Sequence, residues 1–184
     1  MVVVSGRLLV AAPTLADPNF ARTVVLMLAH GEEGALGLVL NRPSEIDVEV
    51  VLTDEWHEAA AAPPTVFFGG PVATESVIGL ARVHGLGDGI GFSASTETLG
   101  TVDLELSPSA IAGGIEVARI FAGHAGWGAG QLEGELQVPG WIVVDALDDD
   151  PFTDDPDGLW RRVLGRQPGR LGWLANFPDS LQSN

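Results

Sequence analysis

The segment of the sequence with the clearest potential for ligand chemistry is the glycine-rich run Gly123–Gly130. Backbone N–H groups of such a run can hold an anion when the run joins a strand to the start of a helix. The glycine spacing of a dinucleotide site is absent, because Gly126-x-Gly128 is followed by Gln131 where the third glycine is required. A phosphate-binding P-loop is excluded because the chain has no lysine. The run therefore predicts either a ligand-binding loop or a tight chain reversal beneath Trp127, with Trp141 packed nearby.

Two arginines beside apolar runs form a second candidate for ligand binding. Arg42 follows Asn41 directly after one apolar run, and Arg22 precedes another. The planar guanidinium group suits a carboxylate or a phosphate. Because the chain holds 25 acidic residues, an internal ion pair that locks a loop is the favoured interpretation, and Asn41 can form a turn through its side chain.

No metal site or cofactor is predicted from the histidines or the acidic residues. The four histidines are His30, His57, His84 and His124. No two of them lie four residues apart, and His57-Glu58 lacks the second histidine of a zinc-protease motif. Seven aspartates lie between Asp145 and Asp157, but Phe152 and Thr153 occupy positions where a calcium-binding loop needs a ligand and a glycine. We expect that acidic stretch to be a solvated loop.

No catalytic residue is predicted either. The chain has no cysteine and no lysine, which removes thiolate and Schiff-base chemistry. Ser93 begins like a nucleophile elbow but lacks the final glycine of that motif. What remains is one candidate binding pocket bounded by the glycine-rich run, by Asn41-Arg42 and by Gly69-Gly70. Its predicted members are Arg22, His30, Asn41, Arg42, Gly69, Gly70, His124, Gly126, Trp127, Gly128 and Gln131.

The elements that position these residues follow from apolar runs and turn residues. A hairpin over 23–28 and 35–40 is so continuously apolar that we expect it to be central and covered on both faces. The other expected strands are 6–10, 65–68 paired with 77–83, 101–106, 119–122 and 141–144. The expected helices are 46–52 capped by Ser44, 54–62, 108–116 capped by Ser107, 131–137 and 159–164. A mobile loop is expected at 85–91, and 123–130 is expected to be a loop.

Composition and charge limit the function classes. The 184 residues fit one domain, 1–184, and carry a net charge of −16, so direct binding to nucleic acid is disfavoured. Residues 161–184 hold four arginines against one aspartate, and we expect this basic, apolar-rich segment to pack on its own domain and pair with the aspartate loop. No signal peptide and no membrane-spanning run is recognised, which predicts a cytoplasmic protein.

Several segments together resemble the YqgE/AlgH family of small bacterial proteins. They are residues 6–13, 17–25, 34–43, 68–72 and 126–133, followed by the strand that begins at Trp141. The resemblance implies an α+β fold whose mixed, branched β-sheet curls into a pseudo-barrel with flanking helices. It implies no established reaction. One member, through alginate control, lends the family a transcriptional-regulator label.

Three functions follow as hypotheses. The first is a non-enzymatic binding or regulatory protein that acts through protein–protein contacts, as a monomer or homodimer. The second is a protein or enzyme that binds a small anion or metabolite in a pocket at Gly123–Gly130, with arginine as the anchor. The third is an indirect transcriptional regulator.

Overall fold

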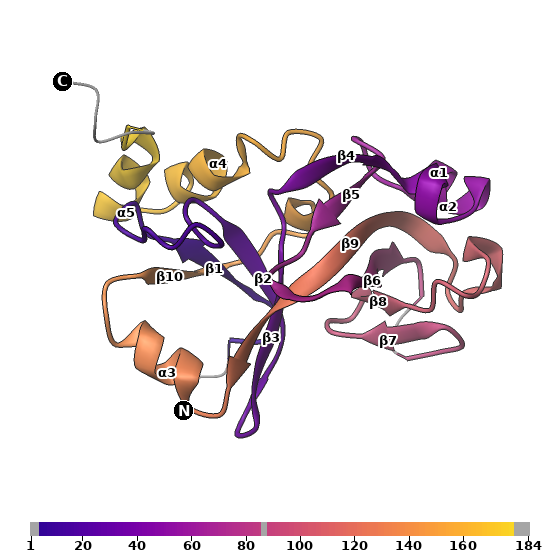
Figure 1. Cartoon of the computed structure of the whole chain (residues 1–184), viewed down its shortest axis with the longest axis horizontal. Coiled ribbons are helices and arrows are strands. Elements are labelled where there is room, and N and C mark those ends of the chain that lie inside the picture. The colour runs from indigo at the N-terminus through magenta and orange to yellow at the C-terminus, as the bar shows by residue number, and fades with distance from the viewer. Residues whose placement is uncertain (1–3, 86–87, 179–184) are drawn as a thin grey trace.

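The described residues, 4–85 and 88–178 of a computed structural model, form a ten-stranded mixed β-sheet with short helices around it (Figure 1). The strands are β1 (Arg7–Ala11), β2 (Val24–Gly31), β3 (Gly34–Val39), β4 (Pro43–Asp47), β5 (Thr65–Phe68), β6 (Val72–Val83), β7 (Phe92–Ala94), β8 (Leu99–Val102), β9 (Ile115–Gly128) and β10 (Trp141–Asp145). The helices are α1 (Val48–Val51), α2 (Asp54–Ala59), α3 (Gln131–Leu136), α4 (Leu159–Gly165) and α5 (Arg170–Trp173). Short 3₁₀ turns lie at 108–110, 150–152 and 174–176.

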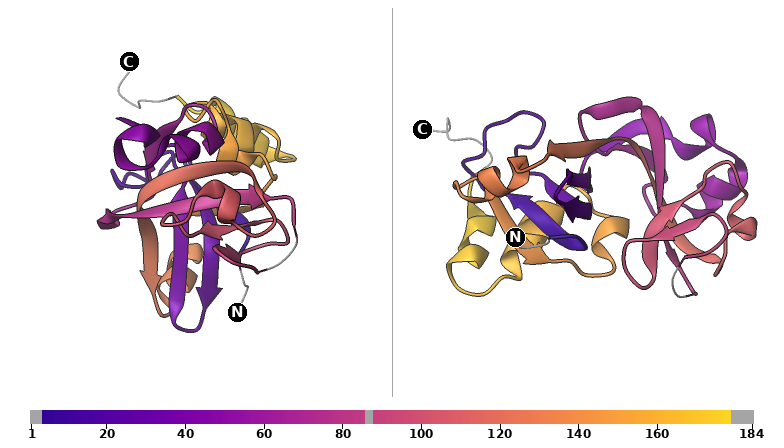
Figure 2. Two further views of the ribbon diagram at one scale, coloured as in Figure 1. Left: turned by 90° about the vertical axis from the view of Figure 1, so that its right-hand side faces the viewer. Right: turned by 90° about the horizontal axis from the view of Figure 1, so that it is seen from below.

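The long strand β9 is the branch point of the sheet. Its last residues, 125–128, pair with β3, and its earlier part pairs with β6, both antiparallel. Strand β5 joins β9 in parallel through Phe121 and Ala122, and β4 pairs with β5. Figure 1 shows β9 crossing from the half that holds β6–β8 to the half that holds β1–β3, and the views in Figure 2 show the curl of the sheet. These pairings confirm the α+β fold with a branched, curled sheet.

The predicted hairpin is confirmed as β2 and β3, and β2 is covered on both faces. Val24 and Leu26 pack in one core cluster with Trp160 of α4. Val25 and Met27, which alternate with them, pack in another cluster with Trp127. Period-two alternation sends successive side chains to opposite faces, so a continuously apolar strand requires two cores.

The prediction of a loop at 123–130 was wrong over most of its length, because Gly123–Gly128 forms the end of β9. Its burial alternates as in a strand: Ala125 and Trp127 are buried, whereas Gly126 and Gly128 are exposed. Glycine lowers strand propensity, but at Gly123 of β9, and at Gly34 of β3 opposite the end of β9, neighbouring backbone needs the space that a side chain would occupy. A Cβ atom on Gly34 of β3, for example, would lie 2.2 Å from the carbonyl oxygen of Trp127.

Three predicted helices are shorter than expected. The helix over 108–116 is only the 3₁₀ turn 108–110: Ile111 is already extended, and Gly113 and Gly114, with φ angles of +84° and +70°, keep the helix from resuming. The helix at 46–52 is α1, which starts at Val48 and is capped by Asp47 instead of Ser44, since Ser44 belongs to the unpredicted strand β4. The helix at 54–62 is α2, which ends at Ala59 before Pro63-Pro64.

The strand predictions for the second half of the sheet also need correction. Residues 65–68 form β5, but its partners are β4 and β9 and not β6. Strand β6 begins at Val72, earlier than expected, and β8 covers 99–102 in place of 101–106. Residues 86 and 87 of the expected mobile loop lie outside the described residues.

The helix α4 packs on the sheet. Leu159, Val163 and Leu164 of α4 are fully buried in the main core. Arg166 forms an ion pair of 2.6 Å with Asp150, whose side chain also accepts the Leu147 N–H. Asp150 is buried, so part of the acidic stretch is structural and not solvated.

Three glycines let β9 pass the segment that follows β5. Gly70 has φ +151°, and a Cβ atom there would lie 2.3 Å from the backbone nitrogen of Ala125. A Cβ atom on Gly69 would lie 2.3 Å from the carbonyl oxygen of Gly123, and one on Gly123 would lie 2.6 Å from that of Gly70. Gly69 also donates its N–H to Ala122 and accepts that of Val39. Backbone therefore contacts backbone at this crossing.

Gly70→Ala is expected to lower the free energy of unfolding by about 3 kcal/mol or more, because the new methyl group meets immobile backbone at an unfavourable φ. Gly134→Ala is the matched control: it lies in α3 with no atom within 4 Å of the added Cβ, and we expect a gain of about 0.5–1 kcal/mol. Urea unfolding of both variants measures the difference. Equal stability of Gly70→Ala and the wild type would refute the close crossing.

Candidate functional site

The loop between β1 and β2 separates three hollows that contain most of the predicted pocket residues. The first, of about 240 Å³, is lined by Arg42, Gly70, Asn19, Phe68, Pro71, Thr74 and Val39. The second, of about 310 Å³, is lined by Arg22, Asn41, Arg42, Ala21, Asp157, Trp160 and Arg161. The third, of about 250 Å³, is lined by Gly126, Trp127, Gln131, Leu15, Asp17, Phe20, Glu135, Val138, Gly140 and Trp141. Most of the predicted residues therefore line these hollows, but they are divided among three of them, and Gly69 and Gly128 line none.

Asn41 and Arg42 fix this loop through its backbone. The Asn41 side chain accepts the Val24 N–H at 2.9 Å and donates to the carbonyl oxygen of Arg22 at 2.8 Å. Arg42 donates to the carbonyl oxygens of Pro18 and Ala21 at 3.2 and 3.0 Å. The expected role of Arg42 in locking a loop is thus present, with carbonyl oxygens in place of the expected carboxylate.

The second hollow brings three arginines together. The Arg22 guanidinium group lies 4.4 Å from the Trp160 ring and donates to the carbonyl oxygens of Phe177 and Pro178. Arg161 donates to the Phe177 carbonyl oxygen as well, at 3.4 Å. These contacts tie the C-terminal segment to the β1–β2 loop. Arg22 adopts φ +57°, a conformation that the Asn41 hydrogen bond to its carbonyl group helps to hold.

The third hollow is built around the carboxylate of Glu135. One oxygen of Glu135 accepts the indole N–H of Trp127 and that of Trp141, each at 3.0 Å. The other accepts the side-chain amide of Gln131 at 3.0 Å, one helical turn earlier in α3. Gln131 in turn accepts the backbone N–H of Gly128 at 3.1 Å. The helix α3 is thereby fastened to the end of β9.

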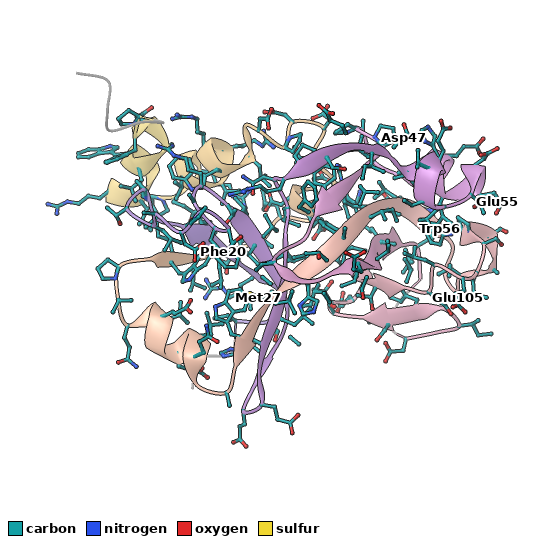
Figure 3. All side chains as sticks on the ribbon, in the orientation of Figure 1. Phe20, Met27, Asp47, Glu55, Trp56 and Glu105 are labelled. Carbon is teal, nitrogen blue, oxygen red and sulfur yellow. The ribbon has the colours of Figure 1, made fainter. Side chains whose placement is uncertain are left out.

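Three aromatic rings complete this hollow. The ring centroid of Phe20 lies 6.1 Å from that of Trp127 and 5.4 Å from that of Trp141. The two tryptophan rings lie 6.2 Å apart at an interplanar angle of 75°, which confirms that Trp141 packs near Trp127. Figure 3 places Phe20 in the half of the molecule with β1 and β10, away from Trp56 and Glu105 in the other half.

The two predicted histidines lie elsewhere. The His30 side chain is 1% exposed; its Nδ1 accepts the Val4 N–H and its Nε2 lies 3.2 Å from a carboxylate oxygen of Glu133. A neutral imidazole with its proton on Nε2 satisfies both contacts. His124 lies on β9 beside Gly126, opposite Val72. Neither histidine lines any of the three hollows.

Comparison with known proteins decides the family. The family profile described as AlgH-like matches residues 8–172. The UPF0301 protein of Streptomyces coelicolor is 48% identical over 184 residues, which cover 98% of this chain and 95% of that protein. The chain belongs to the AlgH-like family.

Two solved structures resemble this AlgH-like protein. The crystal structure of protein DIP2367 from Corynebacterium diphtheriae superposes with a TM-score of 0.84 at 31% identity, covering 95% of this chain and 92% of that one. The solution structure of the AlgH protein from Pseudomonas aeruginosa gives a TM-score of 0.69 at 30% identity, covering 97% and 96%. Among the helices of the AlgH-like protein, within the described residues, none has the length and apolar character needed to cross a membrane.

Sequence reasoning missed Phe20 and Glu135 as neighbours of the glycine-rich run. The spacing of Gln131 and Glu135 on one helix face was a usable signal, because residues four apart are neighbours on a helix. The approach of Phe20 had no local signal, since it depends on how the β1–β2 loop folds back over β9.

A second missed group lies at the start of α1 in the AlgH-like protein. Side-chain ligand atoms of Asp47, Glu49 and His57 lie within 4.8 Å of one another, a set that a metal ion could use. Asp47 already accepts the Glu49 N–H at 3.0 Å and contacts Nδ1 of His57 at 2.7 Å. The hydrogen bond from the Glu49 N–H, and to a smaller extent the contact with His57, holds the pKa of the Asp47 carboxyl below its usual value. A capped helix with a histidine contact accounts for this arrangement.

Arg119 is a buried cation that lines none of the three hollows. It is 1% exposed, lies 4.1 Å above the Phe67 ring and donates to the carbonyl oxygens of Ala62 and Thr153. Burial lowers its pKa to about 10, so it remains charged at neutral pH. Its contacts join β9 to the segments before β5 and before α4, which gives it a structural role.

Asn41→Ala is expected to lower the free energy of unfolding by about 2 kcal/mol, because the Val24 N–H and the Arg22 carbonyl group both lose their partner. Asn41→Asp should also destabilise, since a carboxylate oxygen would face the Arg22 carbonyl oxygen. Asn19→Ala in the same loop is the control and should change the value by less than about 0.5 kcal/mol. Unfolding in urea measures all three. An unchanged stability of Asn41→Ala would show that Asn41 does not hold the loop.

Proposed function

We propose that this AlgH-like protein is a non-enzymatic binding protein that acts through contact with another protein. The observation that carries the proposal is a row of apolar side chains on the sheet, three of which are exposed. We define the apolar row as Phe68, Val72, Val77 and Ala122.

Strand register aligns the apolar row. Phe68 of β5 and Val77 of β6 both pair with Ala122 of β9, one from each side. Residues in register on neighbouring strands project to the same face. Val72 pairs with His124 further along β9, across a register shift between Val72 and Val77. Phe68, Val72 and Val77 are 53%, 41% and 42% exposed. Apolar side chains gathered on one exposed face are typical of protein interaction sites, unlike scattered ones.

Charge indicates the chemistry of the partner. The chain carries a net charge of −16, and Glu75 lies exposed on β6 between Val72 and Val77. A partner that presents apolar side chains within a basic surface complements both features. We therefore commit to a basic protein partner for the apolar row, and a second, equally acidic copy of the chain is disfavoured.

The use of polar groups at the predicted pocket supports binding over catalysis. The side chains of Asn41 and Arg42 form hydrogen bonds with the β1–β2 loop, and the side chain of Gln131 forms hydrogen bonds with Gly128 and Glu135. A nucleophile or general base needs a neighbour that activates it within hydrogen-bond reach of a reacting atom. These residues instead hold backbone and side chains in place. Whether this contact has a regulatory effect depends on which protein binds.

A photo-crosslinking amino acid placed at Phe68 in the native host should give one dominant protein adduct. Val50 of α1 is the matched control site, because it is apolar and 72% exposed but lies outside the apolar row, and it should not give that adduct. Val77→Glu should abolish the Phe68 adduct by placing a charge in the contact, whereas Val50→Glu should leave it unchanged. Gel electrophoresis and mass spectrometry measure the adducts.

Two results would overturn this proposal. One is the same adduct pattern from Phe68 and Val50, which would show that the apolar row is not a specific contact. The other is an adduct made only of two copies of this chain, which would assign the apolar row to self-association. Circular dichroism of Val77→Glu checks that the fold is kept.

A small-anion-binding role is a second candidate function, favoured by the convergence of Arg22, Arg42 and Arg161 on one hollow of about 310 Å³. Inorganic phosphate and ATP are suitable probes, since both carry the oxygens that guanidinium groups bind. The melting temperature should rise with the logarithm of the probe concentration. Arg42→Gln should abolish the rise, and Arg170→Gln in exposed α5 should not. No rise with either probe would rule out this candidate.

A further inference from the structure

We infer that the third hollow, which we call the tryptophan–glutamate hollow, is a binding site for an organic cation such as a guanidinium or alkylammonium group. The tryptophan–glutamate hollow is the space lined by Asp17, Phe20, Trp127, Gln131, Glu135 and Trp141. It shares no residue with the apolar row, and the inference does not depend on the proposed function.

The charge of the hollow favours a cation. Two carboxylates line it, Asp17 and Glu135, and no arginine or histidine is among its lining residues in the described part of the chain. The same lining disfavours the anion that the glycine-rich run predicts, although Gly126, Trp127 and Gln131 are all present. The carboxylates would repel a phosphate or carboxylate group, and no guanidinium group is present to offset them.

The hydrogen bonds of Glu135 orient the carboxylate without neutralising it. Its three donors are two indole N–H groups and one amide, all of them neutral. Among the described residues, no cation forms an ion pair with Glu135. The helix α3 (Gln131–Leu136) itself contains no basic residue that could neutralise Glu135. Both indole N–H groups already donate to Glu135. What the hollow presents to a ligand is therefore carboxylate oxygens, which accept hydrogen bonds, and aromatic rings. A ligand that donates hydrogen bonds and carries positive charge satisfies both.

The aromatic rings supply the second half of the recognition. A guanidinium or ammonium group within about 6 Å of a tryptophan ring centroid is attracted by the ring quadrupole, and tryptophan is the strongest partner. Phe20, Trp127 and Trp141 already touch one another, with centroids 5.4–6.2 Å apart. A cation therefore fits against these rings from the hollow, and not between the rings. The volume of about 250 Å³ is enough for such a group with a short alkyl stem.

Two sources can supply this chemistry. One is an arginine or lysine side chain of a protein partner, and the other is a small free cation. Both present the same charged group to the rings and carboxylates, so the binding site is the same. They differ in whether flanking peptide adds affinity.

The test follows the indole ¹H–¹⁵N signals of Trp127 and Trp141 during titration with three probes. Methylguanidinium is the free cation, acetyl-Ala-Arg-Ala-amide is the peptide form, and methylurea is the neutral isostere. Both cationic probes should shift the two indole signals with saturation in the millimolar range, and methylurea should not. At least tenfold tighter binding of the peptide would assign a partner side chain, and equal affinity would assign a free cation; either supports the site. Affinity should fall as salt is added, because the attraction is between charges.

Two variants separate charge from packing. Glu135→Gln should weaken methylguanidinium binding by about tenfold or more by removing the central charge. Because Glu135 also orders both tryptophans, Asp17→Asn is the second variant; its side chain is exposed, and we expect about threefold weaker binding at an unchanged melting temperature. Glu32→Gln in the exposed β2–β3 turn is the control and should bind as the wild type does.

The inference is overturned if neither cation shifts the indole signals at about 50 mM, a concentration well above the Kd range of specific sites. It is also overturned if methylurea shifts the signals equally, or if Asp17→Asn and Glu135→Gln both bind as tightly as the wild type. Val77→Glu in the apolar row should bind methylguanidinium normally. A failure of the apolar row as a protein contact and a failure of this site are therefore separate results.

Discussion

The crossing of two backbones, β9 and the segment Gly69-Gly70, is the constraint on which the rest of the structure depends. The crossing needs glycines, because side chains at Gly69, Gly70 or Gly123 would meet backbone atoms at 2.3–2.6 Å. Beyond it, β9 continues into the half of the sheet with β1–β3 and delivers Trp127 to that half. Before it, Ala122 joins β5 to β6. One strand therefore carries both the apolar row and the tryptophan–glutamate hollow.

The two surfaces share a preference that follows from charge. An acidic chain attracts basic partners over a Debye length of about 8–10 Å, and local groups then decide what binds. The apolar row offers aliphatic and aromatic contact beside Glu75, and the hollow offers ring faces beside Asp17 and Glu135. The arginines that would suit an anion line the first and second hollows, where Arg22 and Arg42 bind carbonyl oxygens.

Much of the fold could be predicted from the sequence, because the β2–β3 hairpin and α4 have strong apolar patterns. These patterns match the two core clusters into which their side chains pack. The course of β9 through Gly123–Gly128 could not, since a run rich in glycine predicts a loop and the need for glycine at Gly123 comes from the backbone of Gly70, which is distant in sequence. The same reason explains the site. The pairing of Gln131 with Glu135 is local and was readable, whereas the approach of Phe20 to Trp127 depends on how the loop folds back. The helix predicted over 108–116 is only one 3₁₀ turn, because Ile111 is extended and Gly113 and Gly114 adopt positive φ angles.

Native-state hydrogen exchange of β9 tests most directly whether one continuous strand supports both surfaces. If β9 is continuous, the amides of residues 125–128 that pair with β3 exchange as slowly as those of residues 117–121 that pair with β6, through an opening that approaches global unfolding. Exchange of residues 125–128 at rates of an unstructured loop, while residues 117–121 stay protected, would contradict it. The glycine-rich run would then be a loop, and neither Trp127 nor Gly126 would have the fixed position that the hollow requires.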